Sequence, residues 1–554
     1  MEQKNLLIAI ALSFLIFLGW SVLFAPKPVQ KKADLESTTN AANETQPSLT
    51  QPKEETKKAD ATPLVQPGQE TNAQARPAKT ITVNTPLYTM VLTERGAAIK
   101  SMVLKKFHET VGPDSPFKQV VSPDLPGGTA LLSSSGDAGK ALETAHYSME
   151  PNKSSIAVEN TPVDISFKAV LENGLQVEKT FTFSPDSYLV NQKVTLYNGS
   201  DQAFSQHLAF VLQAQMKDHN SRYAFEGPSC LVNNKLEQVK IKDIGEKEPF
   251  SGKVQWVAIE SRYFMSSLVD TKPIEGKMAE EKAGDLIRNI LVLDDGTVAP
   301  HSRKSIEIGI YIGPKSLKIL KALGNGLERA IDFGWFDFIA KPCLWFMNLI
   351  YSVIPNYGVA IIILTIVTRM IFWPLATKSY KSMSEMRKIQ PLMKEVREKY
   401  KDDKTKMNQE MMALYRTYKI NPMGGCLPML IQLPVFFALY RMLYQVIELR
   451  HAPFILWIND LSAPSRLGNF SFKIPLMDPP YGIPVLVLIM GATMLWQQKM
   501  TPSPGDPTQA KMMMLMPVVF TFIFINFPSG LVLYWMVSNL LSIAQQYYTQ
   551  KKTA

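Results

Sequence analysis

The chain has 554 residues, a formal net charge of +10, and a composition that is 46% hydrophobic and 19% charged. Its three cysteines show no CxxC spacing, its six histidines show no metal-ligand spacing, and no GxxxxGK[ST], HExxH or GxSxG motif occurs. These absences argue against a disulfide scaffold, a metal or cofactor site, and any catalytic residue. We therefore expect a protein that is not an enzyme.

The positive charge is concentrated in one segment. Twelve Lys and Arg residues fall between Lys378 and Lys419, and an apolar stretch lies on each side of this segment. Such clustering is typical of a cytoplasmic loop in a membrane protein, which retains basic residues on its inner side. The clustering therefore favours a membrane protein over a protein that binds nucleic acid directly and sequence-specifically.

The N-terminal region predicts a membrane anchor and a tether. Residues 5–25 form an apolar run longer than the core of a cleaved signal peptide. Although Ala25 resembles a cleavage site, we interpret residues 1–25 as an uncleaved signal anchor with its N-terminus in the cytoplasm. Residues 26–79 are rich in Pro, Thr, Gln, Glu and Lys, and we expect a disordered periplasmic linker.

Residues 80–325 change to a period of two. Apolar residues alternate with polar ones over 165–171 and again over 175–183, and Asn173-Gly174 between them favours a tight turn. The pattern predicts a large antiparallel β-sandwich. Trp256, Arg262 and Tyr263 would line a ligand groove, or would be core aromatics beside a solvated arginine, which is the simpler interpretation.

The segment 326–356 is apolar but carries Asp332, Asp337, Lys341 and Pro342. If it crossed the membrane, the basic segment after residue 374 would lie outside, against the usual charge bias. We therefore predict an amphipathic interfacial helix on the periplasmic side.

The remaining chain, 357–554, predicts a helical core. Five apolar spans are expected at about 357–374, 426–447, 482–498, 512–527 and 530–547, which with the anchor gives six spans and two cytoplasmic termini. Three spans have only about 15–17 apolar residues, which at ~1.5 Å per residue cover ~24 Å of the ~30 Å hydrocarbon layer. A locally thinned bilayer and ordinary short, tilted helices both remain open.

A cytoplasmic helical hairpin is predicted over 376–422. Its apolar residues recur every three or four positions on two arms, with Asp402-Asp403 as turn and N-cap between them. The stripe residues are Met383, Met386, Ile389, Met393, Val396 and Tyr400 on one arm and Met407, Met411, Leu414 and Tyr418 on the other. A methionine-filled seam accounts for the stripes, and contact with a client protein is the alternative.

Polar residues interrupt three of the spans. Thr365 and Arg369 share one helix face, Gln432 lies in the next span, and Trp535 is followed by Ser538, Asn539 and Ser542. If these faces converge, they line a hydrated, positively charged groove, because an intramembrane arginine needs water or a partner. Snorkelling of Arg369 to the interface and helix-to-helix hydrogen bonds are the alternatives.

Four segments carry a resemblance to a known family. They are LTIVTRMIFWPL around Arg369, EMMALYRTYKINPMGGCLPMLIQLPVFFALYRML from Glu410, QQKMTP from Gln497, and FPSGLVLYWMVSNLLSIAQQ from Phe527. Together they resemble the YidC/Oxa membrane protein insertases, and within that family the branch of Gram-negative bacteria. The resemblance covers the whole chain. It implies that the periplasmic domain is a supersandwich of the mutarotase type.

The resemblance also implies the function. It places a substrate-binding groove at Arg369, Thr365, Gln432 and Trp535, and we expect further client contacts at Ile361, Met429, Phe436 and Tyr534. The expected protein is an insertase and chaperone of the bacterial inner membrane, with no metal and no cofactor. Its expected partners are nascent hydrophobic membrane proteins, lipids, the Sec translocon, and ribosomes or targeting factors at the hairpin.

Two other classes remain as alternatives. A solute transporter or channel would also place ionisable groups at membrane depth, but the sequence shows no inverted repeat and one prominent intramembrane charge. A membrane-anchored periplasmic enzyme acting on carbohydrates would not need six spans and a basic hairpin. Both are weaker than the insertase interpretation.

Overall fold

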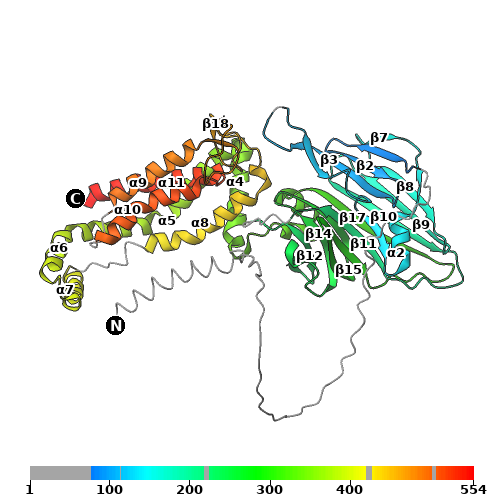
Figure 1. The fold of residues 1–554 in the computed structure, drawn as a ribbon, viewed down its shortest axis with the longest axis horizontal. Helices are drawn as coiled ribbons and strands as arrows, with labels where there is room; N and C mark the ends of the chain where they lie inside the picture. Colours follow the sequence, from blue (N-terminus) through cyan, green and yellow to red (C-terminus); the bar gives the residue numbers. More distant parts are fainter. Residues whose placement is uncertain (1–76, 113, 218–223, 419–426, 502–506, 554) are drawn as a thin grey trace, which may run out of the picture. The chain divides into compact units, whose positions relative to one another are not determined.

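The computed structural model describes residues 77–553 except 113, 218–223, 419–426 and 502–506 (Figure 1). The predicted anchor at 1–25 and nearly all of the predicted linker at 26–79 lie outside the described residues. The remaining description covers a β-sheet domain followed by a helical core.

The β-sheet domain contains two sheets. The first has the order β4 (Phe117–Val121), β3 (Ala98–His108), β2 (Tyr88–Thr93), β1 (Thr80–Asn84) and β7 (Ser155–Ala157). The main path of the second is β13 (Lys235–Gln238), β12 (Gly227–Val232), β14 (Phe250–Glu260), β15 (Phe264–Ala283), β17 (Arg303–Pro314), β10 (Leu189–Asn198), β9 (Leu175–Phe183), β8 (Val163–Val170) and β6 (Ser148–Glu150). Beside this path, β16 (Leu286–Leu293) pairs with β15, β11 (Leu208–Gln215) with β16, and β5 (Leu131–Ser134) with β11. All described pairings are antiparallel except that of β1 with β7. The predicted antiparallel β domain is confirmed.

The hairpin predicted at Asn173-Gly174 joins β8 and β9. Gly174 takes a φ of 81°, a conformation that costs glycine little, and the side chain of Asn173 accepts a hydrogen bond from the backbone N–H of Leu175. The inward residues of the two strands, including Phe167 and Phe181, are buried. The period of two therefore identified the core face of this hairpin correctly.

Lys179 occupies an inward position of β9 among these apolar residues. It is fully buried, and its ammonium donates a 2.6 Å hydrogen bond to the carbonyl of Gly96 and lies 5.2 Å from the ring centre of Tyr147. Burial lowers the pKa of Lys179 to about 7 because the charged form loses its hydration. The strand pattern thus placed a lysine in the core.

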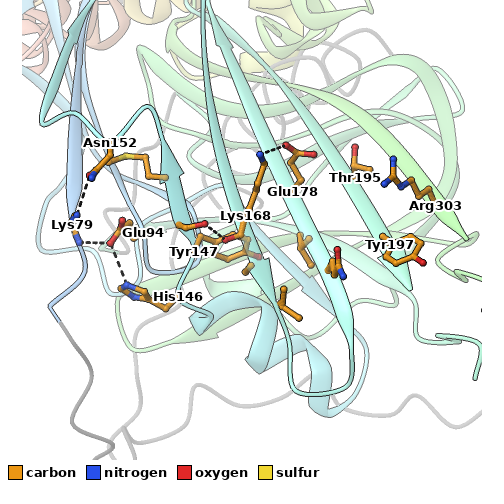
Figure 2. A pocket seen from close by; sticks show the side chains of 16 residues that line it. Lys79, Glu94, His146, Tyr147, Asn152, Lys168, Glu178, Thr195, Tyr197 and Arg303 are labelled. Carbon is orange, nitrogen blue, oxygen red and sulfur yellow. Dashed lines mark hydrogen bonds and ion pairs between the residues drawn. The ribbon is translucent and has the colours of Figure 1, made fainter. Parts of the chain in front are cut away.

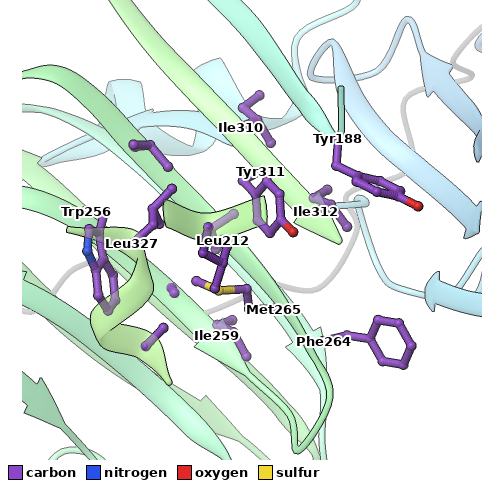
Figure 3. Packing of buried hydrophobic residues seen from close by; sticks show 14 of the residues in the cluster. Tyr188, Leu212, Trp256, Ile259, Phe264, Met265, Ile310, Tyr311, Ile312 and Leu327 are labelled. Carbon is purple, nitrogen blue, oxygen red and sulfur yellow. The ribbon is translucent and has the colours of Figure 1, made fainter. Parts of the chain in front are cut away.

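The core of the β domain is built from large side chains between the strands (Figure 3). Trp256 is fully buried and its indole N–H donates to the carbonyl of Gly326 at 3.3 Å. Arg262 stacks over the rings of Tyr263 and Tyr444, and its Nε donates to the carbonyl of Tyr444 at 2.8 Å. Trp256 is therefore a core aromatic, and Arg262 is engaged in contacts instead of being solvated.

The helical part follows β17. Short elements lead into it: α3 (Leu317–Leu323), η2 (Leu327–Ala330) and η3 (Gly334–Phe336), while α2 (Asp137–Thr144) and η1 (Ile241–Asp243) belong to the β domain. Its main helices are α4 (Asp337–Val353), α5 (Tyr357–Lys388), α6 (Gln390–Lys399), α7 (Lys404–Thr417), α8 (Leu427–Gln445), α9 (Val485–Met500), α10 (Pro507–Phe524) and α11 (Ser529–Thr553). The connection from α8 to α9 holds η5 (Ile447–Leu449) and the small hairpin of β18 (Leu467–Phe470) and β19 (Tyr481–Ile483). Figure 1 shows α5, α8, α9, α10 and α11 running beside one another.

Helix α5 is longer than the predicted span because it continues through Pro374. The arms of the predicted hairpin are the end of α5, α6 and α7, and Asp403 caps α7 by accepting from the N–H of Lys406. Ile389, Met393 and Met411 form a buried cluster between the arms. The seam predicted from the methionine stripes is confirmed.

One helix among the described residues, α5, is both long and apolar enough to cross a membrane; the apolar part of α10, Lys511–Phe524, is shorter. The predicted interfacial segment forms α4, which buries Ala340, Leu344 and Met347 and exposes Phe338 and Trp345. Its outward face is therefore apolar.

Helices α9 and α10 approach closely at Gly491. A Cβ at this position would overlap Oγ1 of Thr521 on α10. We predict that Gly491→Leu lowers the stability of the helical core by about 1–3 kcal/mol, because overpacking forces the two backbones apart. Thermal unfolding of the purified protein in detergent measures this, and Gly112→Leu is the control because a Cβ at Gly112 would meet no atom within 4 Å. Equal melting temperatures for the two variants would contradict the prediction.

Candidate functional site

The site is built where α5 and α11 face each other. Thr365 and Arg369 are four residues apart and therefore lie on the same side of α5. On α11, Tyr534, Ser538 and Ser542 repeat at the same spacing and are all buried. Two polar stripes thus meet at one level of the helical core.

Arg369 is bound by Ser538. The guanidinium Nε and Nη2 both donate to the Ser538 hydroxyl oxygen, at 3.0 and 2.6 Å, and Nε2 of Gln432 on α8 lies 3.4 Å from the same oxygen. Three helices therefore converge on one hydroxyl group. The predicted groove required all the polar faces to converge, and this hydroxyl group brings together Arg369, Gln432 and Ser538 among them.

The charge of Arg369 is not neutralised by this contact. Among the residues that the structure describes, its hydrogen bonds go to the neutral Ser538, and it forms no ion pair with a carboxylate. A hydrogen bond to a charged group contributes about 1.5–3 kcal/mol, and a bond in which both partners are charged is stronger than one to a neutral hydroxyl. Since Arg369 is also partly exposed, an anionic group that reaches it would find a favourable partner.

A second polar edge of α11 contacts other helices. Asn539 donates to the hydroxyl of Thr493 on α9 at 3.3 Å, and Gln546 donates to the carbonyl of Met500 at 2.9 Å. Gln545 donates to the carbonyl of Trp373 on α5 at 2.9 Å. These contacts are helix-to-helix hydrogen bonds that join α11 to two neighbouring helices, α9 and α5.

The other predicted groove residues lie as follows. The hydroxyl of Thr365 is fully buried and donates to the carbonyl of Ile361 one turn earlier, at 2.6 Å. Trp535 lies in an aromatic cluster, with its ring 4.5 Å from Phe436 and 5.0 Å from Phe524. The polar centre therefore unites Arg369 and Gln432, while Thr365 and Trp535 make these contacts elsewhere.

The predicted client contacts are mostly covered. Ile361 and Tyr534 are buried, and Tyr534 interacts with the side chain of Gln432. Phe436 is partly buried against Trp535. Met429 lies in α8, but its side chain is outside the described residues.

Ser538 is the residue whose role the sequence left unassigned. Its position in the polar stripe of α11 was visible, but Asn539 and Ser542 showed the same signal. Only the packing of α5 against α11 shows which of the three faces Arg369. Here Ser542 donates back to the carbonyl of Ser538, and Asn539 turns to α9.

A hollow of about 740 Å³ lies on the β domain (Figure 2). Most of its charged side chains have partners: Lys168 pairs with Glu178 and with Glu150 outside the lining, Lys79 donates to Asn152, and Arg303 lies over the ring of Tyr197. Among the described residues no group of three or more His, Cys, Asp or Glu side chains could hold a metal ion. The hollow therefore offers few unengaged polar groups to a ligand.

Comparisons with known proteins agree with the motifs. Residues 349–554 match the family described as "60Kd inner membrane protein", and residues 80–346 match "YidC periplasmic domain". A "Membrane protein insertase YidC" of Syntrophobacter fumaroxidans is 40% identical over 99% of this chain and 100% of its own length. One of the same description from Geobacter metallireducens is 40% identical over 100% of this chain and 99% of its own.

Among solved structures, an active YidC insertase crystal structure matches 86% of this chain and 93% of its own, with 20% identity and a TM-score of 0.38. The sequence matches span both the β domain and the helical core, and they join these two parts in the same order as in the relatives. From its two matched domains and its full-length relatives, this chain belongs to the YidC family of membrane protein insertases.

Proposed function

We propose that this insertase uses Arg369 to attract the short, acidic extracytoplasmic segment of a client into a hydrated groove. The client's apolar helix then moves along α5 and α11 into the bilayer. Burial of its ~20 apolar residues drives this exit. The membrane potential assists by ~2.3 kcal/mol per negative charge per 100 mV. The protein lowers a barrier and forms no covalent intermediate.

One observation carries this proposal. The guanidinium of Arg369 is partly exposed and bonded to the neutral hydroxyl of Ser538, at a point where α5, α8 and α11 meet. A carboxylate on the client would replace the neutral Ser538 hydroxyl as the acceptor of the Arg369 hydrogen bonds. The new bonds would be stronger because both partners are charged. The neighbouring Met370 and Ile371 are exposed and apolar, which suits the helix that follows such a segment.

The same proposal includes the topology and the partners. The signal anchor, α5, α8, α9, α10 and α11 form six spans, with both termini and the α6–α7 hairpin in the cytoplasm and a supersandwich in the periplasm. The exposed apolar face of α4 lies on the outer membrane surface. The hairpin receives clients from ribosomes or targeting factors, and the protein acts alone or beside the Sec translocon.

Photocrosslinking to a stalled, ribosome-bound client tests the proposed path. A photoreactive residue at Met370 on α5 or Leu540 on α11, both exposed, should give client adducts. The same residue at Met512 on α10, which is also exposed, should give several-fold fewer. The adducts should be lost when the acidic segment of the client is replaced by a basic one, because Arg369 then repels it.

Reversed labelling would contradict the path. If Met512 gave adducts as strong as Met370, the client would not follow α5. If Met370 and Leu540 crosslinked equally to acidic and basic clients, the path would stand but the electrostatic role of Arg369 would not.

A further inference from the structure

The connection between α8 and α9, residues 446–484, is an ordered structure with its own inner layer. It covers the N-terminal ends of α5 and α11: the side chain of Asn356 donates to the carbonyl of Phe454, and the N–H groups of Ser529 and Gly530 donate to Ala463 and Leu461. Inside the connection Ile458, Leu461 and Met477 are buried. It therefore lies at the end of the helical core opposite to the α6–α7 hairpin.

The outer side of this connection exposes large apolar side chains among polar ones such as Asn469, Ser471 and Lys473. Four of the apolar side chains, Leu467, Phe472, Leu476 and Ile483, form what we name the loop face. Leu467 pairs with Ile483 across the β18–β19 hairpin, and Phe472 stacks on Phe470 at 5.3 Å.

Leu476 shows that this exposure is unfavourable in water. It is 76% exposed while the next residue, Met477, is buried, so the chain turns one apolar side chain inward and the other outward. Its φ of 63° is in the left-handed region, which a leucine rarely adopts. Leu456, in the same connection, combines exposure with a φ of 55°. An apolar environment outside the protein would remove the cost of exposing the side chains of Leu476 and Leu456 to water.

Hydrogen bonds from the protein side hold the backbone around Leu476 in place. Asn526, just after α10, donates to the carbonyl of Leu476 at 3.0 Å and accepts from the N–H of Asp478 at 2.9 Å. Arg466 donates to the carbonyl of Ile525 at 2.6 Å and to Asn526. The loop face is thus held in place at the end of α10, and Leu476 does not project by chance.

The loop face continues the exposed apolar surface of the neighbouring helices. Ile483 comes directly before α9, where Leu488 and Ile489 are exposed, and Asn526 follows the exposed Phe522 and Ile523 of α10. At ~1.5 Å per residue, the 16 residues of α9 cover ~24 Å and leave part of a ~30 Å hydrocarbon layer uncovered. Side chains just before the N-terminal end of α9 would then contact the part of the hydrocarbon layer that α9 does not span.

We propose that the loop face inserts its side chains into the outer leaflet of the membrane, at the boundary between headgroups and acyl chains. The backbone stays at headgroup level, because irregular backbone is not tolerated in hydrocarbon. The exposed Lys473 between Phe472 and Leu476 reaches the lipid phosphates. The inference rests on the topology of the proposed function. It adds a second, extracytoplasmic membrane contact that fixes the depth of the short helices α9 and α10.

A depth measurement on the full-length protein tests this. A variant with Cys230, Cys343 and Cys426 replaced by alanine receives one cysteine at Leu476 or Phe472, is labelled with the fluorophore NBD, and is reconstituted in phosphatidylcholine–phosphatidylglycerol vesicles. The control is Val170→Cys on β8, because Val170 is 72% exposed, close to the 76% of Leu476. Insertion of a client into the same vesicles verifies that each variant is folded.

We expect NBD at Leu476 and Phe472 to emit at shorter wavelength than at Val170. Because interfacial burial is ~5–10 Å deep, lipids spin-labelled at acyl carbon 5 should quench it about twofold more than lipids labelled at carbon 12. Adding Asn526→Ala should remove this depth preference at Leu476. Emission and aqueous iodide quenching equal to those at Val170 would overturn the inference. If Arg369→Ala loses client insertion while NBD quenching at Leu476 is unchanged, the membrane contact of the loop face is independent of the proposed function. If NBD at Leu476 is not quenched by lipid while insertion still depends on Arg369, this inference fails and the proposed function stands.

Discussion

Replacing Arg369 by alanine should slow the insertion of a single-span client with an acidic extracytoplasmic segment by about 10- to 100-fold. The substitution removes a charged hydrogen-bonding partner worth about 1.5–3 kcal/mol, and each ~1.4 kcal/mol changes a rate tenfold. The Ser538 hydroxyl and Gln432 amide would remain, but neither carries a charge. Proteoliposomes containing the purified variant and a client synthesised in their presence measure the initial rate.

Two matched protein variants and one altered client make this prediction specific. Arg369→Lys should retain much of the rate, because the role assigned to the residue depends on charge more than on the forked guanidinium. Ser538→Ala should have a smaller effect than Arg369→Ala, because it removes a neutral acceptor and leaves the charge in place. A client whose acidic residues are replaced by neutral ones should be insensitive to Arg369→Ala. Undiminished insertion of acidic clients by Arg369→Ala would refute the electrostatic role.

Replacing Lys315 by methionine should destabilise the β domain by about 3–5 kcal/mol, the usual cost of leaving one member of a buried ion pair without its partner. The Lys315 ammonium lies 2.6 Å from Oε2 of Glu260, whose side chain is fully buried at the end of β14 and also accepts from the hydroxyl of Ser229. For a domain of this size the loss corresponds to a fall in melting temperature of ~6–20 °C. Circular dichroism of the β-sheet signal during heating measures it.

The control is an exposed pair on neighbouring strands. Lys193 on β10 lies 3.4 Å from Glu307 on β17, and both side chains are more than half exposed. Lys193→Met should change stability by less than about 1 kcal/mol, because water screens such a pair. Combining Lys315→Met with Glu260→Gln should recover part of the loss, since no unpaired charge then remains in the core. A Lys315→Met protein as stable as Lys193→Met would show that the buried pair contributes little.

Local patterns predicted most of the fold. The alternation around Asn173-Gly174 gave β8, the turn and β9 with the correct buried face, and the methionine stripes gave the seam of the hairpin. The four apolar segments predicted after residue 426 form the helices α8, α9, α10 and α11. The first predicted core span ends at residue 374, whereas α5 continues through Pro374 for another 14 residues, to Lys388. Here Gln545 of α11 donates to the carbonyl of Trp373 and to the hydroxyl of Thr377, and these bonds support α5 on both sides of the proline.

The amino-acid sequence by itself determined which segments become strands and helices, and where one positive charge falls in an apolar helix, because periodicity and charge are properties of neighbouring residues. Tertiary structure alone decided that Ser538, and not Asn539 or Ser542, binds Arg369, and that Gln432 reaches the same hydroxyl. It also decided that Leu476 faces outward while Met477 is buried. The partner of Arg369 depends on the rotation of each helix and on contacts between residues more than a hundred positions apart. The orientation of Leu476 depends on its hydrogen bond with the distant Asn526. No local sequence pattern records either contact.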